Sequence, residues 1–329
     1  MKKIVLFAAV ICGLCGCVKS ETVIDESEQH REIAFKPFNT KDAMRAPINS
    51  TKLPDDARLG VFAYYHGAKA QKYFENAIFG KKAGTDNTWA GIDATGASRP
   101  YYWPTAGTLD FFAYYPMLDN AGQVAMYYYN NEVSSFAGHA IDITDSQYDL
   151  MFSDLLLGKT SADAGTLGIP MTMHHALTQV VVNIKKTEAT PKLVVTRVTL
   201  NKVFMKAEAF TCEFRAIEGD NTKKQPVGSW VWYTPATSRS DFDIKNANTS
   251  TTESGKTGME ITTNLKQYGD GALIIPFPYV QDTTPNEYAW QTSITIEYTF
   301  DNGGVESEVT HTPQCRHHRS KRQGYMGDG

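Results

Sequence analysis

Hydrophobic and polar residues alternate along most of the chain, and this alternation predicts β-strands. In residues 109–115, hydrophobic side chains occupy positions 109, 111, 113 and 115, and Pro116 follows. Residues 59–65 repeat the pattern. A period of two is typical of a strand with two distinct faces, and proline ends a strand because it lacks a backbone N–H. We expect both segments to lie at the centre of one sheet.

The same pattern predicts strands throughout the rest of the chain, over residues 73–79, 124–129, 149–152, 180–184, 194–200, 273–275, 294–300 and 305–309. Asn302-Gly303 joins the last two, and Asn-Gly between alternating segments is a strong hairpin signal. Stretches with helical periodicity are few, and 12% of the residues are aromatic. The chain is therefore expected to be an all-β protein built from sandwiches. Residues 161–168 are the best candidate for a domain boundary.

The first seventeen residues form a separate segment. Lys2 and Lys3 precede a short apolar run, and Leu-Cys-Gly-Cys at 14–17 matches the box of small residues before a lipidated cysteine. We interpret residues 1–17 as a lipoprotein signal peptide with lipid attached to Cys17. An ordinary secretory signal is the alternative. The run is too short for a comfortable membrane-spanning helix.

Residues 18–32 are polar and are expected to form a solvated tether between the membrane and the fold. A short strand follows, comprising Ile33, Ala34, Phe35, Lys36, Pro37 and Phe38, with Ile33 and Phe35 on one side. A second loose region then covers residues 39–54. A strand isolated between two such segments either docks at the edge of a sheet or is removable.

Charge and cysteine content restrict the partners of the protein. The net charge is −4, and this mild acidity argues against nucleic acid as a partner. Apart from the N-terminal segment the chain has only Cys212 and Cys315, which could pair, but the sequence contains no disulfide framework. The basic residues 313–329 are expected to be a disordered tail.

No catalytic or metal site is predicted. His174-His175 lacks further ligands at metal-site spacing, so a strand with one histidine against the core is favoured. The acidic series Asp142, Asp145, Asp149 and Asp154 lacks the glycine and glutamate of a calcium loop and is expected to be solvated. The tryptophans fit core packing better than a sugar platform. No cofactor is expected.

Several motifs occur in an order that is similar to one known family. They are the box at Cys17, Leu-Gly-Val-Phe-Ala at 59–63, Tyr-Trp-Pro at 102–104, Leu-Asp-Phe-Phe-Ala-Tyr-Tyr-Pro at 109–116, Tyr-Asp-Leu-Met-Phe at 148–152 and Met-His-His-Ala-Leu-Thr-Gln-Val at 173–180. Together they resemble the fimbrillin-like lipoproteins of gut and oral Bacteroidales over roughly residues 1–310. The resemblance implies a pilus subunit of two tandem transthyretin-like β-sandwich domains, here residues 46–165 and 166–312.

The resemblance also implies how such a subunit assembles. In the family, an arginine-specific protease cuts an outer-membrane precursor, the first strand leaves, and a donor strand from the next subunit fills the groove. The cut would fall at Arg45-Ala46, with Arg58 as a second possibility, and residues 33–38 would be the removable strand. The partners implied are other pilus subunits, the protease, the outer membrane through Cys17 and a host or bacterial surface ligand. The protein would begin as a lipid-anchored precursor and end in a surface fimbria.

The chain departs from the family pattern at its C-terminal end, where the basic tail replaces the strands that act as donor. Such a subunit could accept a strand but hardly give one, which suits a pilus tip better than a stalk; the stalk, tip or anchor role stays open. A truncated or frame-shifted gene would give the same sequence. The alternative function is a non-polymerising surface lipoprotein that binds glycan or host protein. An outer-membrane hydrolase is a third hypothesis, for which the sequence supplies no identifiable acid cluster.

Overall fold

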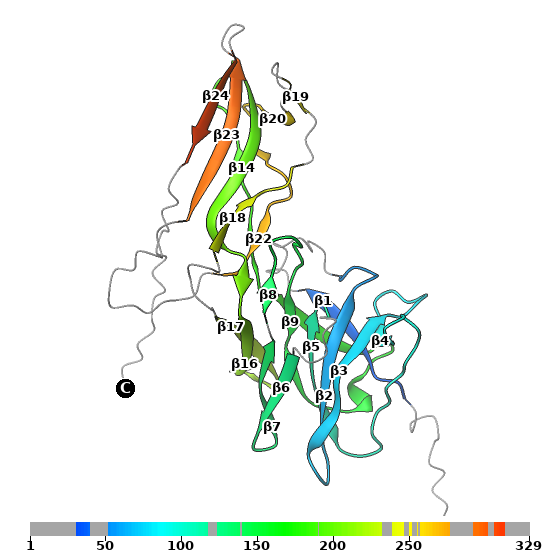
Figure 1. The fold of residues 1–329 in the computed structure, drawn as a ribbon. Helices are drawn as coiled ribbons and strands as arrows, with labels where there is room; N and C mark the ends of the chain where they lie inside the picture. The colour runs from blue at the N-terminus through cyan, green and yellow to red at the C-terminus, as the bar shows by residue number, and fades with distance from the viewer. Residues whose placement is uncertain are drawn as a thin grey trace, which may run out of the picture.

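The computed structural model describes residues 31–39, 52–117, 124–138, 140–189, 191–231, 239–246, 250–251, 255, 257–276, 292–301 and 306–312. These residues form β-strands almost throughout, with one short 3₁₀ turn, η2 (Ser161–Asp163), and the expected all-β class is confirmed. Figure 1 shows two lobes joined end to end, a broad one that contains the N-terminal strands and a narrow one that contains the last strands. In this described part of the chain, no helix is long and apolar enough to cross a membrane.

The strands of the broad lobe close into a ring through their pairing order β2-β3-β4-β1-β11-β9-β5, because β5 also pairs with β2. Closure removes exposed sheet edges within the ring. The members are β1 (Ala34–Asn39), β2 (Arg58–His66), β3 (Gln71–Lys81), β4 (Trp89–Gly91), β5 (Thr108–Tyr115), β9 (Met151–Ser153) and β11 (Ile169–His175).

The same sheet continues beyond the ring from β5 and covers the outside of the ring. It runs through β10 (Leu155–Lys159), β17 (Asp220–Val231), β16 (Ala209–Ile217), β7 (Glu132–Gly138) and β6 (Val124–Tyr129). Strands on both sides of the expected boundary at 165/166 are therefore hydrogen-bonded in one sheet. The division into domains 46–165 and 166–312 stays a prediction.

The narrow lobe is built on the long strand β14 (Lys192–Phe204). Its sheet consists of β19 (Ser250–Thr251), β20 (Thr257–Ile261), β14, β23 (Ser293–Asp301) and β24 (Glu306–His311), with β18 (Arg239–Asp243) beside β14. Three two-stranded sheets accompany it: β12 (Thr178–Val180) with β22 (Ala272–Ile274), β13 (Asn183–Ile184) with β21 (Lys266–Gln267), and β15 (Lys206–Ala207) with β8 (Ile141–Asp142).

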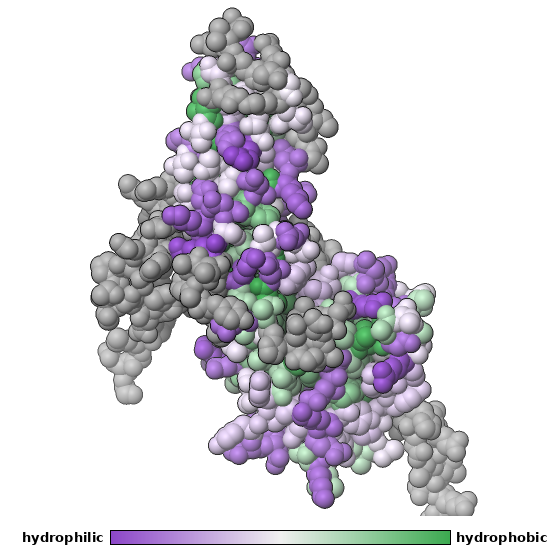
Figure 2. Space-filling view, viewed as in Figure 1, coloured by the Kyte–Doolittle hydropathy of each residue, from purple (hydrophilic) through white to green (hydrophobic). Residues whose placement is uncertain are grey.

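Two hydrophobic cores lie on opposite faces of β2 and β5. Phe111 belongs to the core inside the ring, and its neighbour Phe112 belongs to the outer core. Both faces of these strands are consequently buried. The outer core continues into the narrow lobe through Val198, Leu200 and Met259. On the molecular surface in Figure 2, hydrophilic residues cover much of both lobes and hydrophobic residues show in small areas.

Candidate functional site

The N-terminal strand β1 is the candidate site because it completes the ring. It runs parallel to β11, from Phe35 opposite Ile169 to Asn39 opposite Met173. On its other side it is antiparallel to β4, where Ala34 lies opposite Ala90. The strand is thus held on both sides and is not an edge strand. If it left, β11 and β4 would both present unpaired backbone groups.

The two faces of β1 differ strongly in burial. Ile33 and Phe35 are fully buried inside the ring, as the alternation predicted, and Pro37 is buried with them. The Phe35 ring makes edge contacts with Phe79 and Phe111, at centroid distances of 5.2 and 5.0 Å. Such aromatic pairs add stabilisation beyond the burial of area. Phe35 is therefore the main apolar anchor of the strand.

Pairing between β1 and β4 ends with Phe35 opposite Trp89, and at Pro37 a side chain replaces the backbone partner. The buried Asn87 amide donates to the Pro37 carbonyl at 2.7 Å, and the indole N–H of Trp89 donates to the Asn87 side-chain oxygen at 3.0 Å. Proline has no N–H to continue the ladder with β4. Asn87 thus satisfies the carbonyl that the interrupted ladder leaves open.

The residues before β1 are also attached to the body of the protein. Ile33 N–H donates to the Tyr101 carbonyl at 2.7 Å, and Trp103 N–H donates to the Arg31 carbonyl at 3.0 Å. Glu32 forms an ion pair with Lys82 at 2.8 Å. The expectation that residues 18–32 form a solvated tether is therefore wrong for Arg31 and Glu32. Residues 18–30 lie outside the described residues.

Gly168 lets the backbone of β1 approach closely. Its φ is +100°, and a Cβ built there would lie 2.5 Å from both the carbonyl carbon and the oxygen of Ala34. Glycine alone adopts this backbone region without strain and leaves the space empty. The groove is thus shaped around a strand backbone at this point.

Two histidine–aspartate pairs correct the expectation that the acidic series is solvated. Asp149 and Asp154 are almost fully buried and contact His175 and His174 at 2.8 and 2.7 Å. The sequence pattern missed this because the partners lie on β11, distant along the chain. Among the residues that the structure describes, no cluster of three or more metal-ligating groups occurs.

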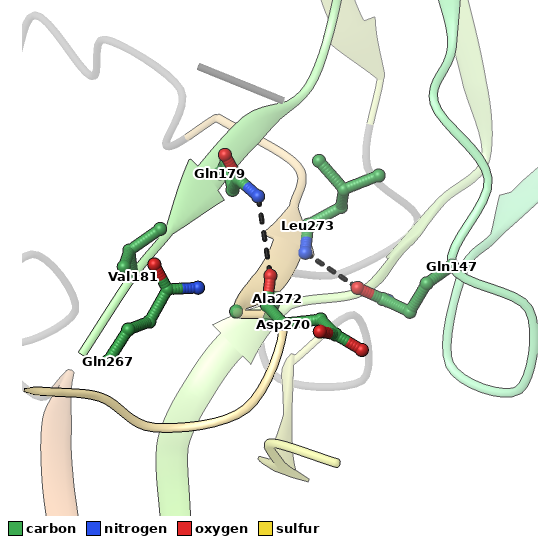
Figure 3. Close-up of a pocket in the computed structure, with 8 residues that line it drawn as sticks. Gln147, Gln179, Val181, Gln267, Asp270, Ala272 and Leu273 are labelled. Atoms are coloured by element: carbon green, nitrogen blue, oxygen red, sulfur yellow. Dashed lines mark hydrogen bonds between the residues drawn. The ribbon is translucent and has the colours of Figure 1, made fainter. Parts of the chain in front are cut away.

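A separate cavity of about 490 Å³ lies at the side of β12 and β22, near the junction of the lobes. Figure 3 shows Gln179, Gln267 and Val181 on one wall and Gln147 on the other. Gln147 accepts a hydrogen bond from Leu273 N–H at 2.6 Å, and the Gln179 amide donates to the Asp270 carbonyl at 3.4 Å. Amide groups and the exposed Asp270 carboxylate give the cavity a polar lining.

The comparison that decides the family covers most of the chain. Residues 45–312 match the model of the fimbrillin-like family. The chain belongs to the fimbrillin-like family. The resemblance drawn from the motifs is confirmed. Membership of the fimbrillin-like family implies a location at the cell surface and interaction with other pilus subunits.

Solved structures with low identity resemble this fimbrillin-like chain. A protein assigned to cell adhesion from Bacteroides uniformis is 11% identical with a TM-score of 0.38, over 86% of this chain and 98% of its own. A fimbrial protein from Bacteroides ovatus is 13% identical with a TM-score of 0.33, over 85% of this chain and 46% of its own. A Bacteroides fragilis protein assigned to cell adhesion is 12% identical with a TM-score of 0.33, over 86% of this chain and 85% of its own. The chain thus spans less than half of the Bacteroides ovatus protein. No curated protein sequence matches it.

The structure describes only some of the sites expected of a fimbrillin-like protein. The removable strand, residues 33–38, corresponds to β1, which begins one residue later and ends one residue later. Cys17, Arg45, Ala46 and the tail 313–329 lie outside the described residues. The second cleavage candidate, Arg58, is the first residue of β2; it is paired with Gly80, and its guanidinium donates to the Ala94 carbonyl at 2.8 Å.

Proposed function

We propose that this chain is a subunit of a surface pilus in which β1 is a replaceable strand. In the precursor, β1 fills the groove between β4 and β11. After cleavage, a strand from another subunit takes the same place. The observation that carries the proposal is that β1 completes a closed ring and buries Ile33 and Phe35 inside it. An emptied groove would expose hydrophobic surface and two strand edges, which a second strand satisfies.

The location of Arg45 supports cleavage there. β1 ends at Asn39 and β2 begins at Arg58, so a cut after Arg45 separates β1 from the body without interrupting any described strand. A cut after Arg58 would fall inside a strand that is paired on both sides, with β3 and β5. We therefore propose Arg45-Ala46 as the site of an arginine-specific protease. Lipid on Cys17 would anchor the precursor in the outer membrane until then.

The deciding measurement is the intact mass of the protein from cell surfaces and from sheared filaments, with and without an inhibitor of arginine-specific proteases. A chain that begins at Ala46 in filaments, and is lost with inhibitor, is expected. Arg45→Gln should block this product, and the control Arg58→Gln should leave it unchanged. A chain that always begins at lipidated Cys17 would refute assembly as a polymerising subunit. The number of copies per filament distinguishes a tip from a stalk.

A second candidate function is ligand binding without polymerisation, and the cavity beside β12 and β22 favours it. Its amides and the Asp270 carboxylate offer hydrogen-bond groups suited to hydroxyls, and Val181 offers an apolar wall. Screening the full chain against immobilised glycans tests this, with Gln267→Ala as the variant and Lys266→Ala as an exposed control outside the cavity lining. Binding lost only in Gln267→Ala would support the ligand site, and absence of binding would dismiss glycans.

A further inference from the structure

The side chain of Arg31 holds the start of β1 to the body of the protein by binding backbone carbonyls. Its guanidinium donates to the carbonyl of Ser161 at 2.6 Å, to that of Gly165 at 3.1 Å, and to that of Ala164. Three oxygens of one short segment, residues 161–165, thus surround a single planar cation. We call these three oxygens the carbonyl cluster.

The carbonyl cluster follows from the local fold. Ser161 begins the short 3₁₀ turn η2, and Ala164 and Gly165 follow its end. The Ser161 carbonyl also accepts from Ala164 N–H, and the Gly165 carbonyl from Gly168 N–H, both at 3.3 Å. A carbonyl oxygen has two lone pairs, so each can accept a second hydrogen bond from an arginine side chain. The cluster can only accept hydrogen bonds, and guanidinium supplies five donors in a planar fork. It is therefore suited to a guanidinium, and less well to a lysine ammonium.

Arg31 also lies at a fixed offset from the buried face of the strand. It precedes Ile33, Phe35 and Pro37 at the same two-residue interval. The alternation of buried residues keeps a strand from slipping by one residue, because that slip would turn the apolar face to solvent. It resists a slip of two residues less well, because the same face stays buried. A two-residue slip moves the chain by about 6.6 Å, at about 3.3 Å per residue, and would take the cation out of reach of the cluster.

We propose that the carbonyl cluster is a guanidinium-binding site that sets the register of any strand in the groove, and that it selects an incoming strand with an arginine two residues before its first buried residue. The proposal rests on the function proposed above and names a property of its partner. The groove then recognises four alternate positions of a strand: a guanidinium group, an aliphatic residue, an aromatic residue and a further apolar residue, as at positions 31, 33, 35 and 37 of this chain. Glu32 and Lys82 contribute little to this selection because the Lys82 side chain of their ion pair is 52% exposed and solvent weakens such pairs.

The test uses the full chain with a recognition sequence for a site-specific protease inserted between residues 40 and 51. After this bond is cut, isotope-labelled peptides of residues 28–39 are added, and mass spectrometry measures how much of the original strand each peptide replaces. Hydrogen bonds to a charged group contribute about 1.5–3 kcal/mol. We therefore expect Arg31→Gln to need at least about tenfold more peptide for half replacement. Arg31→Lys should lie between, and the control Lys36→Gln should stay within about twofold.

A register variant keeps the composition and charge constant. The peptide with both Gln29→Arg and Arg31→Gln carries the same residues, with the arginine two positions earlier. It should replace the strand as poorly as Arg31→Gln. Equal replacement by all peptides would overturn the guanidinium site while leaving the replaceable strand intact. If no peptide entered, the unchanged sequence included, the proposed function itself would fail, and the selection of an incoming strand with it.

Discussion

Phe35 is the residue on which docking of the N-terminal strand most depends. Its ring is fully buried between Phe79 and Phe111, whereas Phe38 on the same strand is 36% exposed. We expect Phe35→Ala to lower the free energy of unfolding of the unprocessed chain by about 3–5 kcal/mol. Phe38→Ala is the matched control and should change it by less than about 0.5 kcal/mol. Chemical denaturation measures both, and equal losses would contradict the assigned faces.

Cys212 gives the protein a specific sensitivity to alkaline pH. Burial raises the pKa of its thiol to about 12. The unfolded thiol ionises from about pH 8.5, so the stabilisation is fully present below that pH and is lost as pH rises toward 12. The expected loss is about 1.4 kcal/mol per pH unit. The free energy of unfolding of the parent, relative to that of Cys212→Ala, should be lower at pH 10.5 than at pH 7. The same difference at both pH values would contradict the buried thiol.

At the scale of elements, the contact between β1 and Gly168 should decide how firmly the strand docks. Alanine at Gly168 meets the backbone of Ala34, whereas alanine at Gly158, also at positive φ (+59°), meets nothing within 4 Å. Both changes carry backbone strain of about 1–2 kcal/mol. Only Gly168→Ala should destabilise further, by about 1–3 kcal/mol, and speed hydrogen exchange in β1. Equal effects of the two variants would show that the close approach is unimportant.

Local pattern was enough to predict many strands but not their partners. β2, β5 and β6 occur within one residue of the predicted ranges, because their alternation is strong. The polar segment 220–226 gave no strand signal, yet it forms part of β17 because β16 pairs with it. Strand propensity depends on such context. The parallel pairing of β1 with β11 joins residues more than a hundred positions apart, and no local pattern encodes it.

The candidate site was predictable only in part for the same reason. The apolar face of residues 33–38 was visible as alternation, and it is buried as expected. The binding of the Arg31 side chain to the carbonyl cluster could not be predicted, because a polar residue among polar neighbours is normally expected to be solvated. Its partners are backbone carbonyls, which carry no sequence signal. The role of Asn87 could not be predicted for the same reason, because its side chain donates to a backbone group, the Pro37 carbonyl.

At the scale of the whole molecule, the shared outer core should make the two lobes unfold together. Ile143 N–H donates to the Met205 carbonyl, and Ile275 N–H to the Phe204 carbonyl, both at 2.9 Å. Met205 is fully buried where the lobes join. Met205→Ala should cost about 2–5 kcal/mol and shift the fluorescence transition of the tryptophans and the hydrogen-exchange transition of β14 equally. The exposed Leu265→Ala is the control. Separate transitions would show that the lobes unfold independently.

The ring also determines how a filament of such subunits would bear tension. β1 is paired with β11 from Phe35 to Asn39 and with β4 at Ala34 and Phe35, so a pull along its axis must shear these hydrogen bonds together. A strand at an open edge, pulled sideways, would instead peel away one bond at a time. A donor strand in the place of β1 would meet the same geometry. The contact between two subunits would then resist flow and drag, because the hydrogen bonds of the donor strand share the force. A precursor strand under no force could still leave the groove.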